Sequence, residues 1–394
     1  MQLKNLFFNN KKEPQPVIKT ESTSINFGSH KIQLQDNKDL LPIIKKYNNY
    51  DWVSYGVDNL HPEFLKQLYL SAPTNGTIIK RKAQMINTGF TFKEENIEED
   101  RLLLVKSLLL QINKQLDSII LDSELYGAFA LEILMSIDKK NIIRINHIPT
   151  DKIRSGEKIN GLVDKYYYCN NWRDWRKEEI YSIDSFEFTD NESSRMLSYV
   201  PMQRISNDYY GDPSYSGGLN WAELERETGV FYGSLIKNGF NPSIMFKFPY
   251  LPTNITEQEE IVQGLKKQYG GSTNAGKSIV LFGQGAENEV KVDTIQTSGT
   301  DATFTVISDQ ITTKVLTSHE VTTPELFGIS EPGRLGSGDF IAKTIAFNEF
   351  VIKPRQRKIE DEINTLFAFV GIDLGFRFNE FDVNIFNKIS NANG

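Results

Sequence analysis

The chain has 394 residues, of which 24% are charged and 39% hydrophobic, and this is enough apolar material for a sizeable core. Its formal net charge of −7 argues against a protein that grips DNA through phosphate contacts, because such proteins are usually basic. No apolar run approaches the roughly 18 residues of a membrane span, and the first residues lack the pattern of a signal peptide. The single cysteine, Cys169, excludes an internal disulfide and fits a reducing compartment.

Residues 1–50 are rich in polar side chains without sustained periodicity, which predicts an extended arm. The sequence leaves open whether this arm has a role or is only a flexible tail. Apolar residues at helical spacing then predict three helices, and Leu103 is expected on the apolar face of the third. These helices run from Pro62 to a break at Ala72-Pro73, from a cap at Thr74 or Asn75 to Gly89, and from about Glu98 to Ser123.

Alternating and β-branched segments follow the third helix and predict short strands. These strands are Tyr126–Leu134, Ile142–Ile148, Lys165–Cys169, Ser185–Phe188 and Met202–Ile205. The first half of the chain is therefore predicted to be an α+β domain with segregated helices and a small antiparallel sheet.

The second half alternates longer helices with isolated strands. Helices are predicted at 216–237, 256–269, 302–318 and 339–368, and strands at 242–248, 278–282, 290–295 and 375–386. Thr256 is the expected cap of its helix. Pro354 inside the last helix predicts a kink near Phe350, because proline removes one backbone hydrogen bond. Arg357 and Glu360, three residues apart, are expected to form an exposed helical ion pair.

The segment Gly271–Ser278 matches the P-loop pattern completely, so a nucleotide-binding enzyme is one alternative function. A P-loop follows a strand and opens a helix, since the helix N-terminus supplies the amides that hold phosphate. Here a predicted helix precedes the segment and a strand follows it. The order of elements favours an ordinary glycine-rich turn.

No other pattern predicts chemistry, and no catalytic residue, cofactor or metal site is expected. The four histidines are dispersed, and one cysteine cannot build a zinc site. Cys169 follows three tyrosines and is interpreted as a packed structural residue. Trp172 and Trp175 could stack on a nucleic-acid base, but a place in the core or an interface is the simpler interpretation.

Several stretches resemble the tailed-bacteriophage portal family, in the order in which that family has them. They are Tyr126-Gly127-Ala128-Phe129, Tyr210-Gly211-Asp212-Pro213-Ser214-Tyr215 with the helix after it, Asn238-Gly239-Phe240-Asn241-Pro242, Asn274-Ala275-Gly276-Lys277, Thr323-Pro324-Glu325-Leu326-Phe327-Gly328-Ile329 and Phe347–Pro354. Each motif alone is weak, whereas the ordered set is specific and spans about residues 60–385. Thr322-Thr323 replaces the family's usual valine-proline.

The resemblance implies an α+β portal fold that assembles into a ring. It assigns 1–50 to an arm, 51–215 to a wing, 216–238 to a stem helix, 239–297 to a clip, 298–321 to a second stem helix, 322–338 to a tunnel loop, 339–368 to a tunnel helix and 369–394 to a terminal wing strand with a short or absent crown.

The function implied by the resemblance is a non-enzymatic ring, typically of twelve copies, at a capsid vertex. Double-stranded DNA would pass through it without sequence-specific binding during packaging and ejection. The implied partners are further copies of the chain, the major capsid protein, the large terminase subunit and a head-tail adaptor. The ring would be assembled in the bacterial cytoplasm and reside in the virion. Another structural head-tail ring protein remains an alternative.

Three groups of residues are the candidate sites. The loop is expected to reach the DNA channel through Gly333, Arg334, Gly336, Ser337 and Gly338. Its base is expected to be fixed by Pro324, Leu326 and Phe327. The clip turn is expected at Asn274, Gly276 and Lys277. Glycines and prolines cannot continue either flanking helix, so the composition favours a mobile loop. An ordinary surface loop is the alternative.

Overall fold

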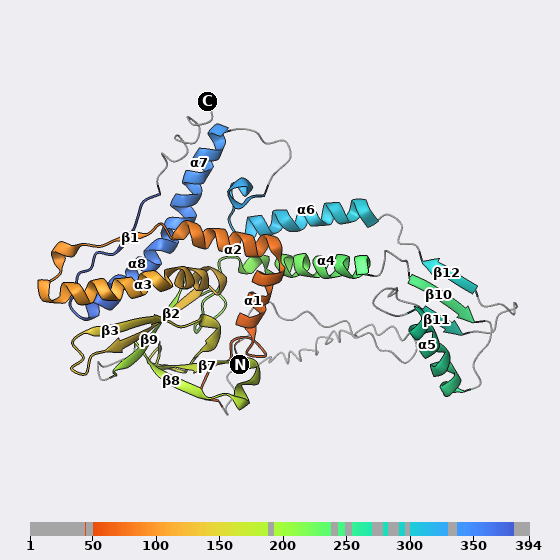
Figure 1. Cartoon of the computed structure of the whole chain (residues 1–394), viewed down its shortest axis with the longest axis horizontal. Coiled ribbons are helices and arrows are strands. Elements are labelled where there is room, and N and C mark those ends of the chain that lie inside the picture. The colour runs from red at the N-terminus through yellow and green to blue at the C-terminus, as the bar shows by residue number, and fades with distance from the viewer. Residues whose placement is uncertain are drawn as a thin grey trace, which may run out of the picture. The chain divides into compact units, whose positions relative to one another are not determined.

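The computed structural model describes residues 44, 50–187, 193–237, 243–248, 254–269, 279–282, 291–295, 300–329 and 337–381 (Figure 1). Apart from Ile44 and Tyr50, the predicted arm lies outside these residues. So do the clip turn with Asn274, Gly276 and Lys277 and the loop residues Gly333, Arg334 and Gly336. Among the described helices, none combines the length and apolar character needed to cross a membrane.

Three helices open the described chain: α1 (His61–Ser71), α2 (Pro73–Ile86) and α3 (Glu99–Leu125), as the apolar spacing predicted. The predicted cap of α2 is wrong. The helix already begins at Pro73, and the amides of Thr74 and Asn75 donate to the carboxylate of Glu225. A carboxylate at this end also complements the helix dipole. Leu103 is 80% exposed, because the buried face of α3 begins at Val105.

A six-stranded sheet lies against α3, in the order β3-β2-β9-β8-β7-β4. Its strands are β2 (Ala128–Met135), β3 (Ile142–His147), β4 (Ile153–Ser155), β7 (Lys165–Cys169), β8 (Ile180–Ser185) and β9 (Arg195–Pro201). The sheet is mixed and not wholly antiparallel as expected, since β8 and β9 run parallel. The predicted strands 185–188 and 202–205 lie too late in the chain, since the observed strands are β8 and β9. Polar residues in β8 obscured the alternation of apolar and polar side chains that marks a strand. The segment 157–163 adds the small hairpin β5 (Lys158–Ile159) and β6 (Leu162–Val163).

The two faces of this sheet contribute to different cores. Phe129, Leu131 and Ile133 belong to a large core that also contains α3 and the C-terminal helices. On the other face, Ala130 lies in a core where the rings of Tyr55 and Tyr210 stack 4.0 Å apart. Alternate residues of one strand thus serve both cores, as the period of two requires.

Two long helices follow the sheet: α4 (Leu219–Lys237), preceded by the 3-10 turn η4 (Ser216–Gly218), and α6 (Thr300–Ser318). They lie side by side (Figure 1) and are called the stem helices below. Between them the chain forms β10 (Ser243–Phe248), α5 (Ile255–Tyr269), β11 (Ile279–Phe282) and β12 (Lys291–Ile295). The strand order is β11-β10-β12, with β10 and β11 parallel. Asn254, and not Thr256, caps α5 by accepting from the Glu257 amide at 2.8 Å.

The last long helix is interrupted. It consists of α7 (Ser337–Phe347), the π-helical segment η6 (Asn348–Ile352) and α8 (Lys353–Phe369). The predicted kink therefore appears as a π segment directly before Pro354. Strand β13 (Arg377–Phe378) follows and pairs with β1 (Phe90–Thr91), not with the six-stranded sheet. Within the described residues the predicted strand 375–386 is reduced to these two residues.

Candidate functional site

The base of the loop 322–338 forms the 3-10 turn η5 (Pro324–Phe327). Pro324 and Phe327 are buried, and the ring of Phe327 meets the Phe347 ring edge-on at 5.7 Å. Leu326 is partly buried against the large core. The turn ends at Gly328, whose φ of 76° is readily adopted by glycine. The loop therefore leaves from a packed turn anchored to α7.

The far end of the same loop is shorter than predicted. Helix α7 begins at Ser337, so Ser337 and Gly338 belong to the helix and not to the loop. Two small residues at this position fit a helix start, where four backbone N–H groups lack intrahelical acceptors.

Between the stem helices and the kinked helix lies a cluster of charged residues, named the junction below: Lys82, Glu124, Glu320 and Arg355. Glu124 is at its centre, at the C-terminal end of α3. Its carboxylate oxygens lie 3.1 Å from Lys82 Nζ and 2.9 Å from Arg355 Nε. Arg355 Nη2 also lies 3.9 Å from Glu320, directly after α6. The junction thus connects α2, α3, α8 and the end of a stem helix.

Lys82 and Glu124 are buried, Arg355 is 12% exposed, and the charges of the junction depend on one another. Burial opposes the ionisation of Glu124, but the attraction of Lys82 and Arg355 prevails and lowers its pKa. Burial, together with the nearby Arg355, lowers the pKa of Lys82 despite the attraction of the Glu124 carboxylate. Charges removed from water in this way persist only when they are paired and hydrogen-bonded.

A second layer of polar groups lies beside the junction. His319, at the end of α6, is fully buried, and its Nε2 lies 2.9 Å from Asn75 Oδ1 of α2. Its ring stacks on Tyr215, whose hydroxyl donates to the carbonyl of Leu125 at 2.8 Å. Burial, together with Lys82 and Arg355, holds the pKa of His319 well below its usual value. The neutral imidazole therefore fixes the stem against α2 and α3.

The two stem helices approach each other very closely at their bases. A Cβ atom placed on Gly218 would lie 2.1 Å from Ser318 Oγ. Only glycine permits this approach, which sets the spacing of η4 and the end of α6.

The π segment is explained by the residues around Pro354. Proline has no N–H and its ring clashes with the carbonyl of the preceding turn, so a regular helix cannot continue there. The wider turn is closed by the Lys353 N–H, which donates to the Asn348 carbonyl five residues earlier. Arg355 Nη1 donates to the Val351 carbonyl at 2.6 Å. The same guanidinium therefore bonds both the helix interruption and Glu124.

Sequence reasoning missed the junction, although one signal was present. Lys82 follows Ile78 and precedes Ile86 at steps of four residues, so a charged residue falls on the buried face of α2. Such a residue requires a buried partner. Its partners could not be identified because Glu124 and Arg355 are far apart in the chain.

The predicted ion pair of the last helix is wrong. Glu360 instead lies 2.8 Å from Arg377 and accepts from the Phe378 amide, and so holds β13. Cys169 is buried, and burial raises the pKa of its thiol, as suits a packed residue. Trp172 is buried beneath the Arg154 guanidinium, 4.7 Å from its ring centre. Within the described residues no group of histidine, cysteine and acidic side chains has metal-binding geometry.

Two buried histidines predict how stability depends on pH. Burial lowers the pKa of His61 to about 4, and the pKa of His319 is also well below 6.5. Between those values and pH 6.5 the unfolded chain binds protons that the folded chain does not, so stability falls as the pH decreases below 6.5. Each histidine should contribute a slope of about 1.4 kcal/mol per pH unit. Unfolding midpoints of the wild type and of His319→Gln between pH 7.5 and 5 measure it. An unchanged slope in the variant would contradict the assignment to His319.

Comparison with solved structures identifies the class of fold. The chain has a TM-score of 0.55 to a chain in the neck of an empty gene transfer agent particle, at 13% identity, over 83% of this chain and 87% of that one. A neck structure of the native particle with twelvefold symmetry gives 0.50 at 14% identity, over 81% and 82%. The chain therefore shares its fold with a chain from the neck of a gene transfer agent particle.

In sequence, the chain is 28% identical over 233 residues to a probable portal protein of Haemophilus phage HP1. That match covers 57% of this chain and 66% of the relative, just under two thirds of its length. No family model matches the chain. The resemblance to phage portal proteins drawn from the ordered motifs is thereby confirmed.

Proposed function

We propose that this protein is a portal subunit, one copy of a ring through which double-stranded DNA enters and leaves a capsid. The observation that carries the proposal is the order of elements along the chain. A sheet domain leads into two stem helices with a small sheet between them, then the turn η5, a Gly/Pro-rich stretch of sequence and an interrupted helix. The same fold occurs in a neck chain, and the sequence is similar to a probable portal protein.

The net charge supports a conduit more than a binding protein. Each copy carries −7, so a ring of many copies repels phosphate overall. DNA can then slide through without the salt-sensitive affinity of a protein rich in phosphate contacts.

The loop, which the start of α7 bounds at 322–336, is proposed to project into the channel. Its base is the packed turn η5, and helix α7 begins where the loop ends. Gly333 and Gly336 permit bending, and Arg334 would repeat around the ring as a belt of positive charge. Such a belt attracts the DNA backbone without reading its sequence.

The proposed partners follow from this position in a particle. They are twelve or so copies of the chain, the major capsid protein, the large terminase subunit during packaging and a head-tail adaptor afterwards. Assembly would take place in the cytoplasm of the bacterial host.

The nucleotide-binding alternative is not favoured by the flanks of Gly271–Ser278. Helix α5 precedes the segment and β11 follows it, which reverses the order that a P-loop needs. Another structural ring protein of the neck remains the second candidate.

One experiment tests both the ring and the loop. Native mass measurement and electron microscopy of the purified protein should show closed rings with a central hole. A variant lacking Gly333–Gly336 should form the same rings as the wild type, because every residue of η5 and α7 is retained. When it replaces the wild-type protein during particle production, it should fail to support DNA packaging. A monomer at micromolar concentration would contradict the portal function. Full packaging by the deletion variant would contradict only the role of the loop.

A further inference from the structure

The π segment exposes a large aromatic side chain. Phe350 is 79% exposed, whereas its neighbours Phe347, Val351 and Ile352 are buried. Leaving an apolar ring of this size in water forgoes roughly 2 kcal/mol or more of transfer free energy. The exposed side chain is explained if a partner covers it in the assembled protein.

Basic residues accompany Phe350 on the helix that follows. Lys353, Arg357 and Lys358 lie within two turns of it, and Arg357 and Lys358 are exposed. Lys353 also contacts Glu349 at 2.5 Å. Phe350, Lys353 and Arg357, spaced by three and then four residues, are called the Phe350 ridge below. The ridge therefore combines one aromatic side chain with the positive charge of Arg357, while the charge of Lys353 is compensated by Glu349.

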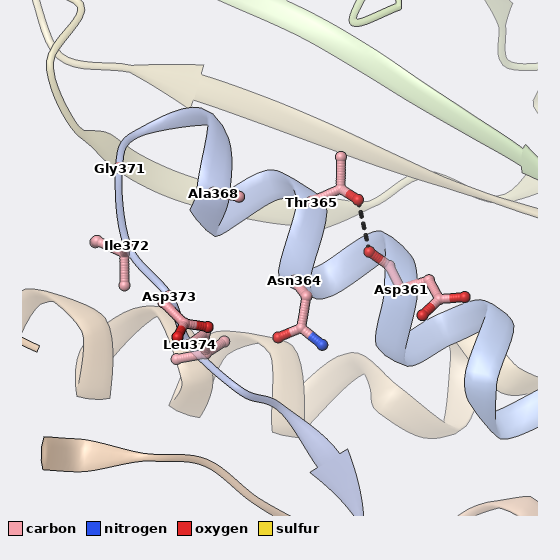
Figure 2. A pocket seen from close by; sticks show the side chains of 8 residues that line it. All are labelled: Asp361, Asn364, Thr365, Ala368, Gly371, Ile372, Asp373 and Leu374. Carbon is pink, nitrogen blue, oxygen red and sulfur yellow. Dashed lines mark hydrogen bonds between the residues drawn. The ribbon is translucent and has the colours of Figure 1, made fainter. Parts of the chain in front are cut away.

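The other end of α8 carries a groove with the opposite properties (Figure 2). Its volume is about 610 Å³, and it lies between the last two turns of the helix and the segment that returns toward β13. Thr365, Ala368 and Gly371 line its floor, and because these residues are small they leave the groove open. The lining residues include two carboxylates, Asp361 and Asp373, and Asp373 accepts from Asn96 at 2.9 Å. The groove thus has small residues on its floor and two negatively charged carboxylates at its rim.

Phe350 cannot reach the groove of its own chain. Eighteen residues separate Phe350 from Ala368 along a continuous helical segment, which places them about 27 Å apart. The charges of ridge and groove are nevertheless complementary: Arg357 accompanies the Phe350 ring, and the carboxylates of Asp361 and Asp373 line the groove. A contact between two different surfaces of identical chains is heterologous, and such contacts form a ring when the rotation from one copy to the next closes.

We propose that the Phe350 ridge of one copy inserts into the groove between Asp361 and Asp373 of the next copy. Phe350 covers the floor formed by Ala368 and Gly371, and Arg357 faces the carboxylate of Asp373. The inference rests on the proposed function, since it assigns the ring contact to particular residues. It also gives the π segment a role in assembly, because that segment carries the exposed Phe350 ring.

The contact is tested by two variants that alter its two sides separately. Phe350→Ser removes the anchor, and Ala368→Trp fills the floor of the groove. Each should raise the protein concentration at half-assembly at least tenfold while the far-UV spectrum stays that of the wild type. Leu103→Ser is the matched control, since Leu103 is as exposed as Phe350 but belongs to neither surface. It should assemble as the wild type does.

A charge exchange separates a lost contact from a damaged fold. Arg357→Asp and Asp373→Arg should each weaken assembly, and the double variant should restore it toward the wild-type concentration. Restored assembly with an unchanged far-UV spectrum is the result expected of a contact between copies. Normal rings from both Phe350→Ser and Ala368→Trp, or no restoration by the double variant, would overturn the inference and leave the portal function intact. If the wild type forms no ring, the proposed function itself fails.

Discussion

Replacement of Glu124 by glutamine is expected to lower the free energy of unfolding by about 3–5 kcal/mol. The change keeps the size of the side chain but removes the one carboxylate that both Lys82 and Arg355 contact. The buried Lys82 would then lie close to Arg355 with only the more distant Glu320 to compensate the two positive charges. Urea unfolding of the full chain, followed by circular dichroism, measures the loss.

Glu320 provides the matched control for this change. It contacts the same guanidinium, but its side chain is 53% exposed and lies 3.9 Å away. Glu320→Gln should therefore change the unfolding free energy by less than about 1 kcal/mol. Equal effects of the two substitutions would show that the burial of the junction does not determine its energy.

A substitution at Gly127 is expected to be of comparable severity. Gly127 has a φ of 69°, and an added Cβ would lie 2.2 Å from the carbonyl carbon and oxygen of Asp212. A Cβ atom added to Gly211 would likewise lie 2.1 Å from the carbonyl oxygen of Gly127. Two backbone segments far apart in the chain thus touch through glycines. Gly127→Ala should destabilise the protein by about 2–5 kcal/mol, from left-handed strain and overpacking together.

The contribution of backbone strain alone can be measured at Gly161. This residue also has a positive φ, 88°, but no atom lies within 4 Å of an added Cβ. Gly161→Ala should therefore cost only about 1–2 kcal/mol. If Gly127→Ala melts at the same temperature as Gly161→Ala, the close approach to Asp212 contributes nothing.

The amino-acid sequence alone predicted most of the elements. The helices at 62–71, 98–123 and 216–237 and the strand at 165–169 were evident because apolar residues recur with the period of the element. Pro354 predicted the interruption of the last helix from covalent geometry. The ordered motifs also indicated the portal family, and two of them, around Gly127 and Gly211, are the segments whose backbones touch.

The tertiary structure alone decided which residues meet. Sheet order, the parallel pairing of β8 with β9 and the pairing of β13 with β1 depend on distant segments, which no local pattern encodes. The same holds for Glu225 at the start of α2 and for the junction. A buried charge such as Lys82 shows that a partner is needed, but burial, distance and pairing are properties of the packed chain. That is why Glu124 and Arg355 could be identified only once α2, α3 and α8 were seen in contact.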